Sequence, residues 1–193
     1  FIHGSFANSG AWRHYVGAFQ GKYQCIRIKL PGHDSPELSP EHAKRFSNDA
    51  EFVEFILNQL IFEPIKLVGH SYGAVVCVEL ALRKNISIES MTLFEPVSVW
   101  TLRNIGDANS QQIMQRFLSQ LDAKYRDEPQ SVSQLVLDFW NHEAVYDALP
   151  ERVKEQMSPS VAHNLTQWEW CTGLSHANRE LNEMNIPTDF VFG

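Results

Sequence analysis

Long apolar runs are missing from this sequence of 193 residues, which contains no stretch of the roughly 18 apolar residues that a membrane-spanning helix requires. No secretory signal peptide is visible at the beginning of the sequence either. From these absences we expect no membrane span, and we predict a cytoplasmic location.

Cysteine is scarce as well, with three residues at positions 25, 77 and 171. They are too few and too widely spaced for a disulfide framework, and none stands at metal-ligand spacing from the eight histidines. We therefore expect reduced thiols, with Cys77 in the core. Neither a metal ion nor another cofactor is predicted.

Basic residues are outnumbered, with 16 Lys and Arg against 23 Asp and Glu, which gives a formal net charge of −7. No cluster of Lys and Arg stands out that could hold phosphate groups. Nucleic acid is therefore not expected as a partner. The sequence does not indicate an oligomeric state.

The order of apolar patterns along the chain predicts the fold class. Segments with strand patterns alternate with segments with helix patterns in the first half of the chain. Strands are expected at residues 1–2, 23–30, 65–68, 86–94 and near 190, and helices at 9–19, 49–60 and 74–85. Such alternation predicts an α/β fold, with a mostly parallel sheet covered by helices on both faces.

The spacing of apolar residues also predicts which face of each helix is buried. For the helix at residues 49–60, the expected inner face consists of Phe52, Phe55, Ile56 and Leu60. For the helix at residues 9–19, it consists of Trp12, Tyr15, Val16 and Phe19. Asn48 stands three residues before Glu51, a spacing that is typical of a capping box at the start of a helix.

The pattern changes near residue 97, because helical periodicity then continues to about residue 175 without a convincing strand. We predict a core formed by residues 1–97 and 176–193, with residues 98–175 as a helical cap. The insertion holds four of the five tryptophans, Trp100, Trp140, Trp168 and Trp170. These indoles either line an apolar pocket under the cap or pack the insertion's own core.

The most informative motif is Gly69-His70-Ser71-Tyr72-Gly73, which follows a strand-like apolar run and precedes a helical one. A strand, a tight turn and a helix with Ser at the apex are typical of a nucleophile elbow. The apex residue is held in a strained backbone conformation, and glycine on both flanks removes collisions with neighbouring backbone. The alternative is an ordinary turn in which Ser71 caps the helix.

Together with the motifs before and after it, which follow in the same order, this motif resembles those of the α/β-hydrolases that carry a helical cap. The shared elements are the His3-Gly4-Ser5 loop, the turn at residues 30–33, the elbow, the strand that ends at Glu95, and the cap. The resemblance implies that the backbone N–H groups of Ser5 and Tyr72 form an oxyanion hole. The expected substrate pocket is made by His3, Phe6, His70, Trp100 and Trp140.

A serine nucleophile also needs a base and a carboxylate that orients the base. The resemblance places this acid in the turn after the strand near residue 190 and the histidine one strand further on, both beyond Gly193. Glu95 is the alternative acid, because it stands at the carboxyl end of the strand next to the elbow. We expect His3 and His33 to hold loops, and neither His142 nor His163 convinces as the base.

The resulting prediction is a serine hydrolase that cleaves a small-molecule ester with an apolar acyl group through an acyl-enzyme on Ser71. C–C bond hydrolases and thioesterases of the same fold stay open. So does a non-catalytic, ligand-binding relative of the hydrolases. The resemblance argues against a dehalogenase or epoxide hydrolase, whose nucleophile at the apex is Asp. Both ends of the sequence look cut, so we expect this stretch alone to be inactive.

Overall fold

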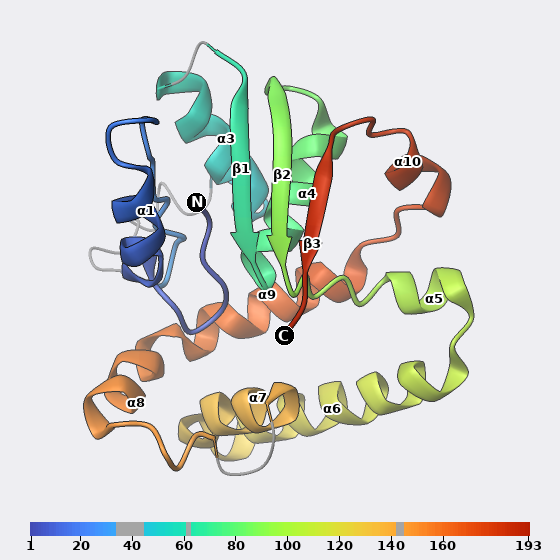
Figure 1. Ribbon diagram of the computed structural model, residues 1–193. Coiled ribbons are helices and arrows are strands. Elements are labelled where there is room, and N and C mark those ends of the chain that lie inside the picture. The colour runs from blue at the N-terminus through green and yellow to red at the C-terminus, as the bar shows by residue number, and fades with distance from the viewer. Residues whose placement is uncertain (34–44, 61–62, 142–144) are drawn as a thin grey trace. The chain divides into compact units, whose positions relative to one another are not determined.

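A computed structural model describes residues 1–33, 45–60, 63–141 and 145–193 of the chain (Figure 1). The chain divides into two compact units. The first, called the sheet unit below, consists of residues 1–98 and 176–193, and the second, called the helical unit, consists of residues 99–175. That the helical unit acts as a cap stays a prediction.

A parallel sheet forms the centre of the sheet unit, as the strand and helix patterns predicted. Its order is β1 (Ile65–His70), β2 (Ile88–Phe94) and β3 (Thr188–Val191). Residue His70 pairs with Phe94, and Phe94 in turn pairs with Val191. Because all three strands are parallel, their carboxyl ends meet at one edge of the sheet, where side chains that follow the strands can converge.

The expected strand at residues 23–30 was wrong in its extent. Among the described residues, this segment contributes one bridge, from Ile28 to Ile2, and Ile2 also bridges Gly69. Ile28 donates its N–H to the carbonyl of Phe1 at 3.0 Å, and the Phe1 amine donates to Ile26 at 2.9 Å. A ladder needs successive residue pairs, and these bonds involve one such pair.

The described part of the sheet unit contains a 3₁₀ turn and four α-helices. A 3₁₀ turn, η1 (Ser9–Trp12), leads into α1 (Arg13–Phe19), and the others are α3 (Asp49–Leu60), α4 (Tyr72–Arg83) and α10 (Asn178–Asn182). Helices α3 and α4 lie together behind the sheet as drawn in Figure 1. Nearly all of α4 is buried, because it packs between β1 and α3.

The buried face of α3 differs from the expected one. Its buried residues are Asp49, Ala50, Val53 and Leu57, whereas Phe55 and Leu60 remain 39% and 55% exposed. Small side chains on the face toward α4 let the two helices approach closely, which a row of phenylalanines would prevent. In α1, likewise, Tyr15 and Phe19 are exposed rather than buried.

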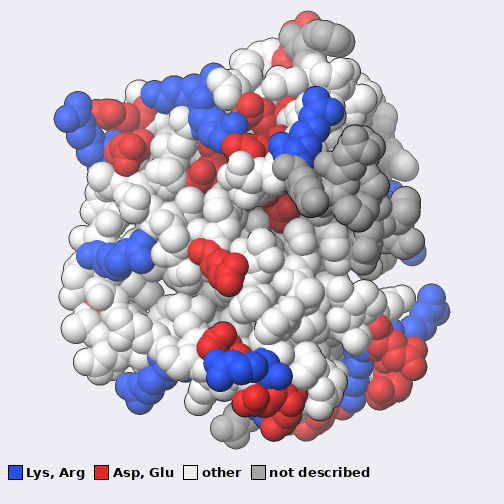
Figure 2. Space-filling view, turned by 180° about the vertical axis from the view of Figure 1, so that it is seen from behind, with Lys and Arg blue, Asp and Glu red and all other residues white. Residues whose placement is uncertain are grey.

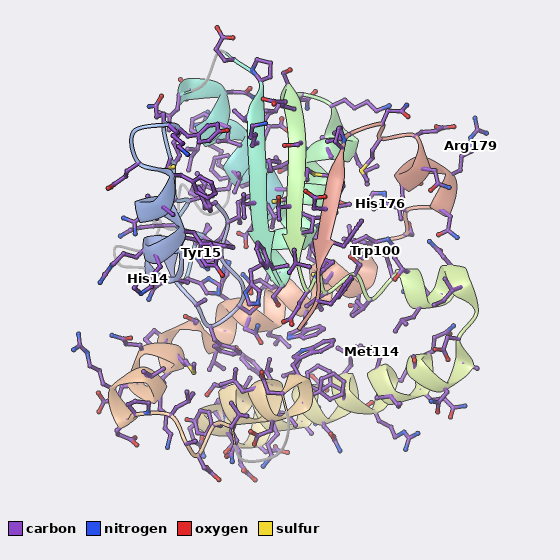
Figure 3. The ribbon with its side chains drawn as sticks, in the orientation of Figure 1. His14, Tyr15, Trp100, Met114, His176 and Arg179 are labelled. Atoms are coloured by element: carbon purple, nitrogen blue, oxygen red, sulfur yellow. The ribbon has the colours of Figure 1, made fainter. Side chains whose placement is uncertain are left out.

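The start of α3 is capped, although by a variant of the expected pattern. Asn48 Oδ1 accepts the N–H of Glu51 at 3.0 Å, as a capping residue does. The Glu51 carboxylate, however, accepts the N–H of Ser47 at 2.8 Å, one residue before the one that a capping box uses. The other end of the sheet unit is tied down by His176, labelled in Figure 3, which bonds Glu79 of α4.

The helical unit contains α5 (Thr101–Ile105), α6 (Ala108–Asp127), α7 (Val132–Trp140), α8 (Glu151–Met157) and α9 (Val161–Gly173), with short 3₁₀ turns at residues 129–131 and 158–160. Aromatic rings form its core: Phe117 stacks on Phe139 with centroids 4.0 Å apart and meets Trp168 edge-on at 5.1 Å. Tryptophan in this unit therefore serves packing at Trp168.

The surface and the helix lengths bear on possible partners. Figure 2 shows acidic and basic side chains interspersed on one face, rather than gathered into a single basic area. That nucleic acid is not a partner stays a prediction. Within the stretches that the structure describes, no helix combines the length and apolar character that crossing a bilayer demands.

Candidate active site

The elbow is a sharp turn between β1 and α4 with Ser71 at its apex. β1 ends at His70 and α4 begins at Tyr72, while Ser71 itself has φ 53° and ψ −118°. A positive φ is uncommon for a residue with a side chain and stores strain. Backbone bonds hold the turn: Ser71 donates its N–H to Phe94 at 2.9 Å, and its carbonyl accepts from Ala74 at 3.1 Å and from Val75 at 3.4 Å.

Glycines make the turn sterically possible. A Cβ on Gly69 would lie 2.6 Å from the carbonyl oxygen of Gly73 and 2.7 Å from the Cα of Ala74. A Cβ on Gly73 would collide with the carbonyl oxygens of Ile2 and His3. The first loop of the chain therefore passes directly against the first turn of α4, and neither glycine tolerates a side chain.

The same loop approaches the apex at Gly4, where an added Cβ would lie 3.0 Å from the Cβ of Ser71. Ser5 follows at once, and Phe6 adopts a left-handed φ of 56°. Ala7 closes the loop by donating its N–H to Gly4 at 3.3 Å. This arrangement brings the peptide of Ser5 close to the elbow, as an oxyanion donor requires; the oxyanion role of Ser5 and Tyr72 stays a prediction.

His3 holds this loop in place, as expected. It is fully buried, and its Nε2 accepts the N–H of Leu30 at 3.2 Å. The proton must then sit on Nδ1, which donates to the carbonyl of Gly4 at 2.9 Å. His33 lies nearby, with its ring 5.1 Å from that of His3 and its Nδ1 3.0 Å from the Pro31 carbonyl oxygen.

Glu95, the alternative acid, lies next to the elbow at the carboxyl end of β2. Its backbone has φ 45°, and its N–H donates to Val191 at 2.9 Å. One carboxylate oxygen accepts the N–H of Gly193 at 3.1 Å, and the other lies 3.9 Å from Nε2 of His70. The carboxylate therefore bonds backbone at the edge where the strands end, and it also faces a histidine.

Two ionisable groups near the elbow have shifted pKa values. Burial lowers the pKa of His70, and the neighbouring Glu95 carboxylate offsets part of this shift. His70 is therefore neutral near pH 7. On α4, burial raises the pKa of the Cys77 thiol to about 12, so that this cysteine is a core residue and not a nucleophile.

A cavity of about 170 Å³ lies beside the elbow within the sheet unit. Its lining includes two of the predicted pocket residues, His3 and His70, together with Gly4, Ala11, Trp12, Tyr15 and Phe94. Tyr15, labelled in Figure 3, extends from α1 to place its ring 6.1 Å from that of Phe94. Sequence patterns did not indicate the contribution of Trp12 and Tyr15, which they assigned to a helix core.

The remaining predicted site residues are distributed as follows. Phe6 is half-buried and does not line this cavity. Trp100 and Trp140 belong to the helical unit, where Trp100 is buried and Trp140 is 47% exposed, its ring parallel to that of Trp168. Their part in a substrate pocket stays a prediction. His163 lies on α9, and His142 falls outside the described residues.

Comparison with known proteins identifies the family of the chain. The model of the alpha/beta hydrolase fold family matches residues 1–172. The chain belongs to the alpha/beta hydrolase fold family. This confirms the family resemblance and the fold class that the sequence predicted.

Similar proteins carry several different names. A haloalkane dehalogenase from Agrobacterium fabrum is 28% identical over 109 residues, which are 56% of this chain and 34% of the relative. The uncharacterized hydrolase YugF from Bacillus subtilis is 30% identical over 83 residues, which are 43% of this chain and 30% of the relative. The chain thus spans about a third of the length of the curated relatives it matches.

Solved structures show the same fold at low identity. An epoxide hydrolase from Bacillus megaterium matches with a TM-score of 0.64 and 20% identity, over 100% of this chain and 74% of that one. MenH from S. aureus matches with a TM-score of 0.63 and 19% identity, over 98% of this chain and 72% of that one. At such identities the likeness concerns the fold and leaves the reaction open.

Proposed function

We propose that this chain carries the nucleophile and oxyanion hole of a serine hydrolase, with Ser71 as the nucleophile. One observation carries the proposal: Ser71 occupies a strained apex at the start of α4, yet its side chain makes no capping bond to the helix. A serine placed there only as a cap would accept an N–H from the first turn. The hydroxyl is instead left for a substrate.

In the proposed reaction, Ser71 Oγ attacks the carbonyl carbon of an ester, and the carbonyl π electrons move to the oxygen. The N–H groups of Ser5 and Tyr72 stabilise this oxyanion, each by about 3 kcal/mol. A base takes the Ser71 proton during the attack and gives it to the departing alkoxide, so that the intermediate collapses with loss of the alcohol. Water, losing a proton to the same base, then attacks the acyl-enzyme, and the base returns this proton to Ser71 Oγ as the acid leaves. The base is proposed to lie beyond Gly193, where the family resemblance implies it.

The proposed substrate is a small-molecule carboxylic ester with an apolar acyl group, and the helical unit is proposed to act as its cap. Aromatic side chains support an apolar ligand in each unit: Trp12 and Tyr15 line the cavity beside the elbow, and Trp140 exposes its ring in the helical unit. Ser71 also distinguishes the chain from the Asp nucleophile that the family resemblance implies for dehalogenases and epoxide hydrolases.

Labelling by a fluorophosphonate tests this function in the whole protein. We expect one label per molecule, located on Ser71 by mass spectrometry, and loss of both label and ester hydrolysis in Ser71→Ala with an unchanged melting temperature. Ser119→Ala, on an exposed face of α6, is the matched control and should label like the unmodified protein. Full labelling of Ser71→Ala would refute the proposal.

A second experiment concerns the acid. Since one oxygen of Glu95 is already bonded to Gly193, we expect Glu95→Gln to change kcat by less than about tenfold, with the acid beyond Gly193. A loss of about ten-thousandfold, with normal folding, would instead make Glu95 the group that orients the histidine.

A further inference from the structure

Tyr72 and Asp49 join the start of α4 to the start of α3. The Tyr72 phenol donates a hydrogen bond to Asp49 Oδ2 at 3.0 Å, although the two residues are 23 positions apart in the sequence. Each is the first residue of its helix, and they are only 4% and 6% exposed. A hydrogen bond between buried groups is protected from competition by water, so it fixes the two helix starts relative to each other.

The two helix starts differ in how they are held. Asn48 caps α3 through a side-chain bond to the N–H of Glu51, whereas Ser71 provides no such cap for α4. The first turn of α4 must therefore be fixed by other contacts. One is the close fit of Gly73 against the first loop, and another is the phenol of Tyr72.

The peptide between Ser71 and Tyr72 is where this fixation matters. Ser71 has a strained φ of 53°, and such strain persists only where surrounding contacts over-determine the backbone. Rotation of this peptide would relax Ser71 and turn the N–H of Tyr72 at the same time. The side chain of Tyr72, bonded to Asp49, resists that rotation because it anchors the Cα of the same residue.

We propose that Tyr72 and Asp49 form a positioning pair, which holds the peptide N–H of Tyr72 toward the oxyanion that develops during attack by Ser71. This inference rests on the proposed function. The phenol of Tyr72 and the carboxylate of Asp49 act through the backbone of Tyr72, so these two side chains have a positioning role, and the N–H that they position is the group proposed to contact the oxyanion. The position of Asp49 in the first turn of α3 also favours its carboxylate form, because the helix dipole stabilises negative charge there.

The test compares variants of the whole protein. Tyr72→Phe removes only the hydroxyl, and we expect kcat to fall about tenfold or more while KM changes by less than about twofold, because small displacements of oxyanion donors are costly. Asp49→Asn keeps an oxygen that accepts the bond and should retain kcat within about threefold. Tyr23→Phe, the same change on a 54% exposed residue, is the matched control.

Further readouts separate positioning from mere folding. The rate of fluorophosphonate labelling should fall in step with kcat in Tyr72→Phe, while the final stoichiometry stays at one label per molecule. In Asp49→Leu, which removes the acceptor, the loss should match that of Tyr72→Phe, and the double variant should be no worse than either alone. If Asp49→Leu does not fold, Tyr72→Phe and Asp49→Asn still decide the question.

Different failures overturn different claims. If Ser71 of the unmodified protein does not label, the proposed function fails and the positioning role fails with it. If Ser71 labels normally and Tyr72→Phe keeps the kcat and labelling rate of the unmodified protein, only the positioning role is overturned. A lower melting temperature with unchanged kcat also overturns that role alone, because the bond would then serve folding and not positioning.

Discussion

Backbone atoms shape the elbow of the sheet unit, whereas aromatic side chains shape the core of the helical unit. At the elbow, Gly69 and Gly73 bring main chain against main chain, and Ser71 is strained but held by bonds to other segments. In the helical unit, Phe117 contacts Phe139 and Trp168 through ring faces and edges. The contrast separates a region whose geometry is fixed by backbone contacts from a region whose geometry depends on the packing of side chains.

The two regions also differ in whether their buried polar groups have hydrogen-bond partners. Beside the elbow, His3 uses both ring nitrogens in hydrogen bonds. On α9, Asn164 is fully buried, yet within the described ranges neither atom of its amide has a hydrogen-bond partner, and the same is true of the Trp168 indole N–H. Satisfied polar groups specify one arrangement, whereas unsatisfied ones cost stability.

The largest expected effect on stability comes from adding one methyl group at the elbow, and the same change in the helical unit serves for comparison. Gly73→Ala should lower the free energy of unfolding by about 3 kcal/mol, because its Cβ meets backbone carbonyls that cannot move aside. Gly173→Ala, at the end of α9 with nothing within 4 Å of its Cβ, should be neutral or stabilise by about 0.5 kcal/mol. Urea unfolding measures both free energies. Equal effects would show that the backbone contacts at Gly73 exclude a methyl group no more strictly than the surroundings of Gly173 do.

A slightly smaller effect is expected where the backbone itself acts. Ser5→Pro deletes the N–H proposed for the oxyanion hole and should lower kcat by about a hundredfold, whereas Ser5→Ala should be mild. Steady-state kinetics on the whole protein distinguish the two. Equal damage from both substitutions would show that the Ser5 side chain, not its peptide, is needed.

On the helical side, removing an unsatisfied amide should stabilise the protein. Asn164→Leu replaces a buried amide without partners by an apolar group of similar size, and we expect the free energy of unfolding to rise by about 1 kcal/mol. Asn141→Leu, whose exposed amide donates to Leu137 at 2.9 Å, is the control and should bring no gain. Destabilisation by Asn164→Leu would mean that the amide is bonded after all.

The smallest effect concerns the pH response of the elbow. Burial lowers the pKa of His70 in the folded protein, so the unfolded chain binds the proton first as the pH falls. The stability associated with neutral His70 is therefore present above its unfolded pKa and is lost as the pH falls through the folded value. An NMR titration should place its midpoint below about 6.5, the unperturbed value.

Glu95→Gln tests the contribution of the Glu95 carboxylate to the pKa of His70. Because the Glu95 carboxylate raises the pKa of His70 against the effect of burial, its removal should move the midpoint of His70 further down. His70→Gln identifies the signal. A midpoint that rises in Glu95→Gln would contradict the assigned electrostatic contact.

Much of the elbow could be predicted from sequence because its causes are local. The apolar run before Gly69 and the glycines around Ser71 define a strand, a tight turn and a helix without reference to distant segments. The bounds of α3 were also predicted correctly, since Asn48 marks its start. The parallel sheet followed from the alternation of strand and helix patterns.

Other features could not be predicted, because they depend on what a residue meets in space. Periodicity assigned the phenylalanines of α3 to its inner face, but contact with α4 selected the face with Ala50 and Val53. No spacing in the sequence connects Asp49 with Tyr72. The strand expected at residues 23–30 was likewise wrong in its extent, and among the described residues this segment makes one bridge, between Ile28 and Ile2.

The order of elements and the position of Ser71 could therefore be predicted from the sequence, since backbone sterics and short-range patterns encode both, and the resemblance of its motifs indicated the family. Three contacts could be learned from the structure alone: Glu95 lies 3.9 Å from His70, His3 Nε2 accepts the N–H of Leu30, and the Tyr72 phenol donates to Asp49. Each of these contacts joins segments that are distant in the chain, so its geometry exists only once those segments have packed together.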